Sequence, residues 1–127
     1  QWDAARDALE DFRLADGPSG ELQARESRLR NLSLYWEQFD KGMELQKQGS
    51  FAQAIEAFGN AAKMPVGQDR VNKAIEAIRD CKYGMLMKQG SDAEQGNRKG
   101  EALAYYRVAQ KEKDTQEVRD AIARCGG

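Results

Sequence analysis

The sequence predicts an all-α fold, with about five to six helices in a single domain. The helix formers Ala, Glu, Gln, Arg, Lys and Leu dominate its 127 residues, and no alternating Val/Ile/Thr run indicates a strand. Turn clusters rich in Gly, Pro and Ser divide the chain into helical segments. One face of small and aromatic side chains recurs three times at helical spacing, as is typical of helices that stack through equivalent faces.

The first predicted helix covers residues 2–15 and ends in the turn cluster at 16–20. A long helix over residues 21–48 follows. Its apolar residues recur with a seven-residue rhythm at Leu22, Leu29, Leu32, Trp36, Phe39 and Met43. We expect Trp36, Phe39 and Met43 of this stripe, together with Tyr35, to form core rather than an aromatic ligand pocket, because apolar stripes at helical spacing usually face the core.

Two similar stop signals divide the rest of the chain. Lys47-Gln48-Gly49-Ser50 recurs as Lys88-Gln89-Gly90-Ser91, and a glycine past the last turn can adopt the left-handed conformation that ends a helix. The sequence also predicts a polar loop over residues 91–100 and a helix cap at Asp114 and Thr115. The remaining helices are expected over residues 51–64, 69–89, 101–113 and 116–125.

The recurring face contains an alanine, an aromatic residue four positions later and a second alanine three positions after that. The alanines let a neighbouring helix approach closely, and the ring fills the space between them. The three copies are Ala8, Phe12 and Ala15; Ala54, Phe58 and Ala61; and Ala102, Tyr106 and Ala109.

These residues resemble the tetratricopeptide repeat family, in which the second helix of each pair carries alanine, an aromatic residue and alanine, and proline closes the pair. Pro65 lies near that closing position, and Trp36, Phe39 and Met43 resemble the large residues of the family's first helix. The chain departs from the family at Asp40, where a glycine is expected. Its copies also lie about 46 and 48 residues apart, whereas the family unit has 34.

The resemblance implies an α-solenoid of antiparallel helix pairs over residues 1–127, with two complete pairs between two unpaired helices. Because stacked pairs bury their apolar faces against neighbours, we expect a piece of a longer chain or assembly. Its ends should expose apolar residues such as Trp2, Leu9, Phe12, Val118 and Ile122. The expected units are an orphan second-type helix at 1–20, pairs at 21–66 and 67–113, and the start of a further helix at 114–127.

Charge and hydropathy argue against nucleic-acid binding and membrane insertion. Twenty basic residues oppose twenty-one acidic ones, and their signs alternate along the helices, whereas nucleic-acid binders usually carry a one-signed basic face. No run approaches the roughly 18 apolar residues that a membrane span needs. We expect a soluble domain, and favour a cytoplasmic over an extracytoplasmic location.

The residue types also argue against an enzyme. Histidine is absent, which removes the commonest general base and metal ligand. Cys81 and Cys125 occupy equivalent repeat positions, and we expect both to be buried small hydrophobic residues rather than a disulfide or a redox pair. The sequence therefore predicts no catalytic, metal or cofactor site.

The resemblance implies a protein–protein interaction module, because in that family a groove lined by first helices holds a peptide or a partner helix. The partner is thus expected to be a peptide or protein within a larger assembly. The alternative is an oligomerisation or spacer domain that uses the helix over 21–48 as a self-association seam. The residues expected to line the groove are Leu34, Glu37, Lys41, Glu44, Glu76, Arg79, Tyr83 and Leu86.

The groove assignment depends on which residue corresponds to the family glycine. If it is Gly42 rather than Asp40, the faces exchange, and Phe39 and Met43 line the groove instead. Some relatives hold a terminal carboxylate with lysine and asparagine side chains, and only Lys41 is suitable for that role here.

Overall fold

The computed structural model describes residues 19–127, and in that range it contains five α-helices and no strand. The all-α prediction is therefore confirmed for this part of the chain, while the predicted helix over residues 2–15 lies outside it. The helices are α2 (Ser19–Lys47), α3 (Phe51–Ala62), α4 (Gln68–Gln95), α5 (Lys99–Glu112) and α6 (Gln116–Arg124).

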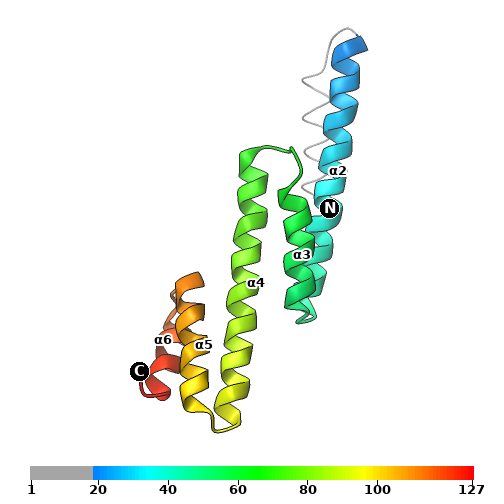
Figure 1. Cartoon of the computed structure of the whole chain (residues 1–127). Coiled ribbons are helices and arrows are strands. Elements are labelled where there is room, and N and C mark those ends of the chain that lie inside the picture. Colours follow the sequence, from blue (N-terminus) through cyan, green and yellow to red (C-terminus); the bar gives the residue numbers. More distant parts are fainter. Residues whose placement is uncertain (1–18) are drawn as a thin grey trace.

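Consecutive helices run in alternating directions, and each packs against the next along the chain (Figure 1). α4 is the central element. Its N-terminal half packs with α2 and α3, and its C-terminal half packs with α5 and α6. The described chain therefore buries its apolar residues in two clusters that follow one another along α4.

The helix ends agree with the sequence at some positions and differ at others. α2 begins at Ser19, inside the expected turn cluster, and ends before Gly49, whose φ of +81° is the left-handed conformation expected of a stop signal. Thr115 caps α6 by accepting a hydrogen bond from the Val118 amide, as expected.

The predicted stop at Gly90 is wrong. α4 continues through this residue to Gln95, so the loop expected over 91–100 shrinks to residues 96–98. Gly90 is buried, and a Cβ atom there would lie 2.5 Å from Tyr106 Cε1. The missing side chain therefore serves the close approach of α5 rather than a turn, and the turn itself is made at Asn97, with a φ of +61°.

The same contact occurs in the preceding pair of helices. A Cβ atom at Gly42 of α2 would lie 2.7 Å from the Phe58 ring of α3. Gly42 and Gly90 are 48 residues apart, as are Phe58 and Tyr106. An aromatic ring of one helix thus lies on a glycine of the preceding helix at two places with identical sequence spacing.

The two described copies of the small–aromatic–small face are buried as predicted. All six residues are at most 2% exposed. The copy around Phe12 lies outside the described residues. The buried members of the two copies are Ala54, Phe58 and Ala61 in α3, and Ala102, Tyr106 and Ala109 in α5.

The aromatic stripe of α2 forms the first core cluster together with α3 and α4. Tyr35, Trp36 and Phe39 are buried, with their ring centroids 4.9 to 5.7 Å apart. The Tyr35 hydroxyl donates a hydrogen bond of 2.6 Å to the Arg70 carbonyl at the start of α4. The prediction of a core stripe is therefore confirmed at these three positions. It is wrong at Met43, which is 49% exposed.

The second core cluster joins the C-terminal half of α4 to α5 and α6. Val118 is fully buried in it, and Ile122 packs against it with part of its surface exposed. The expected apolar end is therefore absent at Val118, because α6 folds back onto α4 and α5. Trp2, Leu9 and Phe12 lie outside the described residues.

Candidate functional site

The eight residues expected to line a groove lie on α2 and α4. Six of them are exposed, and two are half-buried. Lys41 lines a small groove of about 280 Å³ between α2 and α3, where it faces Gln53, Glu56 and Asn60 of α3. Glu76 and Arg79 of α4 form an exposed ion pair one turn apart. Leu34, Glu37 and Glu44 are the other exposed members, all on α2.

Tyr83 and Leu86, the two expected anchors, both pack against the second core cluster. The Tyr83 hydroxyl lies 2.5 Å from Thr115 Oγ1, and the Lys113 ammonium lies 6.0 Å from the centre of its ring. Tyr83 therefore helps to hold α6 in place. A substitution there would change the packing of the fold as well as any binding surface.

The alternative register places Phe39 and Met43 in the groove. Gly42 does lie in close contact with Phe58, as a glycine between paired helices would. However, Phe39 is only 7% exposed and belongs to the core, so of the two residues only Met43 is available to a partner.

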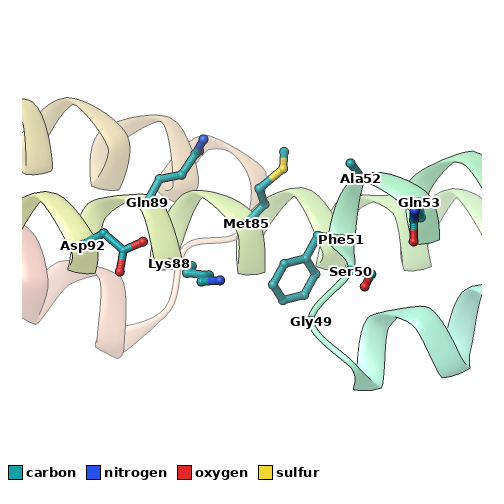
Figure 2. A pocket seen from close by; sticks show the side chains of 9 residues that line it. All are labelled: Gly49, Ser50, Phe51, Ala52, Gln53, Met85, Lys88, Gln89 and Asp92. Atoms are coloured by element: carbon teal, nitrogen blue, oxygen red, sulfur yellow. The ribbon is translucent and has the colours of Figure 1, made fainter.

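The larger groove lies between the α2–α3 turn and the middle of α4, and we call it the α3–α4 groove. It is open to solvent and has a volume of about 480 Å³, within the range of ligand pockets. Figure 2 shows the turn and the first residues of α3 on one side and α4 on the other. Its lining residues are Gly49, Ser50, Phe51, Ala52, Gln53, Met85, Lys88, Gln89 and Asp92.

This groove exists because α4 is much longer than α3. Ala74 and Cys81 of α4 share the first core cluster with residues of α3. Met85, Lys88 and Asp92 continue the same stripe of α4, since residues three and four apart lie on one helix face. α3 begins at Phe51, whose ring lies against Gly84, and beyond this point the stripe lines an open groove among residues 19–127.

The groove has an apolar end and a charged end. In Figure 2 the Lys88 side chain lies between Asp92 and the Phe51 ring. Lys88 and Asp92 are exposed, and neither forms an ion pair with another described residue. Ser50, at the start of α3, makes no side-chain capping hydrogen bond. The groove thus offers polar groups whose hydrogen-bonding and charge capacity is not used within the described fold.

Sequence reasoning missed this groove because it ended α4 at Gly90. With Asp92 assigned to a loop, the spacing of Met85, Lys88 and Asp92 along one helix face could not be recognised. The repeated segment around Lys88 is the available signal, but by itself it predicts only a stop.

A hydrogen-bonded charged network lies on the opposite side of α4. Arg124 of α6 donates two hydrogen bonds to Glu94, of 2.9 and 3.0 Å, and the Tyr106 hydroxyl donates a third of 2.8 Å. These hydrogen bonds lower the pKa of Glu94 to about 2, and those from Arg124 have the largest effect. Burial, and then the bond to Glu94, raise the pKa of Tyr106 to about 12. This network joins α4, α5 and α6.

Both cysteines are buried and free, as expected. Burial, and then the charge of Asp80, raise the pKa of the Cys81 thiol to about 11, so this thiol is protonated at neutral pH and a poor nucleophile. Within residues 19–127, no cluster of three or more potential metal ligands is found. No helix in that range combines the length and apolar character that crossing a bilayer requires.

No family model, curated protein or solved structure matches this chain. The function of the α3–α4 groove is therefore inferred from its geometry alone.

Proposed function

We propose that this chain is a protein–protein interaction module that binds a segment of a partner protein in the α3–α4 groove. One observation carries the proposal. Past Gly84, the face of α4 that α3 covers continues along Met85, Lys88 and Asp92, which line an open groove in the described part of the chain. A helix face that is packed along half its length and open along the other half provides a preformed surface on a rigid element.

The resemblance to helical repeat proteins is part of the proposal. The equal spacing of the Gly42–Phe58 and Gly90–Tyr106 contacts supports it, because a repeated unit places the same contact at the same sequence interval. In this view α2 with α3, and α4 with α5, are successive pairs. Such proteins bind their partners on extended concave surfaces.

The self-association seam receives less support. Leu32, Trp36 and Phe39, at the centre of the seven-residue rhythm, are buried within the chain's own first core cluster. Leu22 and Met43, near the two ends of the stripe, are exposed. A two-stranded coiled coil needs a continuous apolar seam, and here the middle of the stripe is already occupied.

A displayed library of random peptides, selected on the whole folded chain, tests the proposal. We expect peptides that bind in solution and whose addition shifts backbone amide NMR signals of residues 49–53 and 85–92. Met85→Glu should abolish this binding, because it places a carboxylate beside the Phe51 ring. The matched control is Ile75→Glu, on the same helix at a 44% exposed position outside the groove, and it should bind normally. Selection of no peptide, or shifts confined to another surface, would refute the proposal.

A further inference from the structure

The α3–α4 groove changes from apolar to charged along its length. At the end near α3, the half-buried Phe51 ring and Met85 provide an apolar contact. Towards the C-terminal end of α4, Lys88 and then Asp92 follow. A bound segment would therefore meet an apolar surface, a positive charge and a negative charge in that order.

The two charges have a spacing that an extended chain can match. Lys88 and Asp92 are four residues apart on α4, which corresponds to an axial rise of about 6 Å. Side chains two residues apart on one side of an extended strand are separated by about 6.6 Å. An acidic and a basic residue at alternate positions of an extended peptide can thus reach both groups together.

A helical ligand fits this groove less well. Helices that bind in grooves present several apolar anchors along one stripe and need an apolar surface of similar length. Here the apolar surface is limited to the neighbourhood of Phe51 and Met85, and the rest of the α4 stripe is polar. One apolar anchor followed by two charges is better matched by an extended segment.

Resting on the proposed function, we infer that the groove's partner is an extended peptide segment carrying an apolar, an acidic and a basic side chain in that order from the α3 end. The apolar side chain packs against Phe51 and Met85, the acidic one pairs with Lys88, and the basic one pairs with Asp92. The charges of Lys88 and Asp92 determine the order of the acidic and basic residues in the peptide, because complementary charges mainly set specificity.

Two synthetic peptides of identical composition test this inference. One carries the apolar, acidic and basic residues in the stated order, and in the other the acidic and basic residues are exchanged. Binding to the whole chain is measured by fluorescence anisotropy at low salt. We expect the first peptide to bind about tenfold more tightly, because exchanging two exposed ion pairs for two repulsions has about this effect.

The double variant Lys88→Glu with Asp92→Lys keeps the net charge and should reverse the preference. The matched control, Glu76→Lys with Lys82→Glu, exchanges charges at exposed positions of α4 outside the groove, and it should leave the preference unchanged. Urea unfolding of both variants verifies that each is folded.

The outcomes separate the two proposals. If both peptides bind equally and Met85→Glu abolishes their binding, the inferred motif is wrong while the groove remains a binding site. If the preference survives the charge exchange, Lys88 and Asp92 do not set it and the inferred motif is wrong. If neither peptide binds and the displayed library yields none, the proposed function fails and the inferred motif fails with it.

Discussion

Replacement of Gly90 by alanine tests the close packing of α5 on α4. In a helix interior this change normally stabilises a protein by about 0.5–1 kcal/mol, because alanine loses less conformational freedom on folding. At Gly90 the new Cβ would lie 2.5, 2.8 and 2.9 Å from three atoms of the Tyr106 ring. Overpacking of this kind costs about 1–3 kcal/mol.

The overpacking cost at Gly90 should fall in the upper part of that range, so it exceeds the gain that alanine normally brings in a helix. Tyr106 is only 2% exposed, and its hydroxyl is bound to Glu94, so the ring cannot move aside without breaking that hydrogen bond. We therefore expect Gly90→Ala to lower the free energy of unfolding by about 1–2 kcal/mol. Gly59→Ala is the matched control, because this helical position has nothing within 4 Å of the added Cβ. It should raise the free energy of unfolding by about 0.5–1 kcal/mol.

Urea denaturation followed by circular dichroism measures both changes, and a constant slope against urea would show that the unfolded reference is unchanged. A Tyr106→Leu background provides a second test, since a smaller and more flexible side chain should remove most of the cost of Gly90→Ala. Equal stabilisation by alanine at Gly59 and Gly90 would refute the close contact, and with it the structural equivalence of Gly90 and Gly42.

Two further predictions concern the two core clusters. Phe58→Ala should lower the free energy of unfolding by about 3–5 kcal/mol, because the ring is fully buried between α2 and α3; a loss below about 1 kcal/mol in urea denaturation would contradict this placement. The pKa of Glu94 is lowered from 4.5 to about 2 in the folded chain, so its stabilising effect is complete above pH 4.5 and is lost as the pH falls towards 2. The stability difference between the wild type and Arg124→Gln should therefore shrink over that interval, and a difference that stays constant with pH would show that the Glu94 interactions do not form.

The helices and their buried faces were largely predictable from the sequence. The spacing of Ala54, Phe58 and Ala61 is a local property of the chain, and it identifies the inward face whatever neighbour the helix meets. The cap at Thr115 and the stop at Gly49 are also local, because each depends on groups within a few residues. These features needed no knowledge of the tertiary arrangement.

The role of Gly90 could not be determined in this way. Gly49 and Gly90 lie in the same four-residue context, yet one ends a helix and the other continues it beneath an aromatic ring. A glycine favours both uses, through its access to positive φ and its lack of a side chain. Only the packing of Tyr106 against α4 decides between them.

The exposure of individual side chains also depended on tertiary packing and could not be predicted from the sequence. Met43 follows the apolar rhythm of α2 but remains exposed, whereas Tyr83 and Leu86, expected in an open groove, are held by the second core cluster. Periodicity identifies which residues share a helix face, but how far along that face a neighbour extends depends on helix lengths and crossings. The sequence alone thus determined the helical class and the two described small–aromatic–small faces. The tertiary structure decided where α3 begins against α4, and therefore which part of α4 the other described helices leave open.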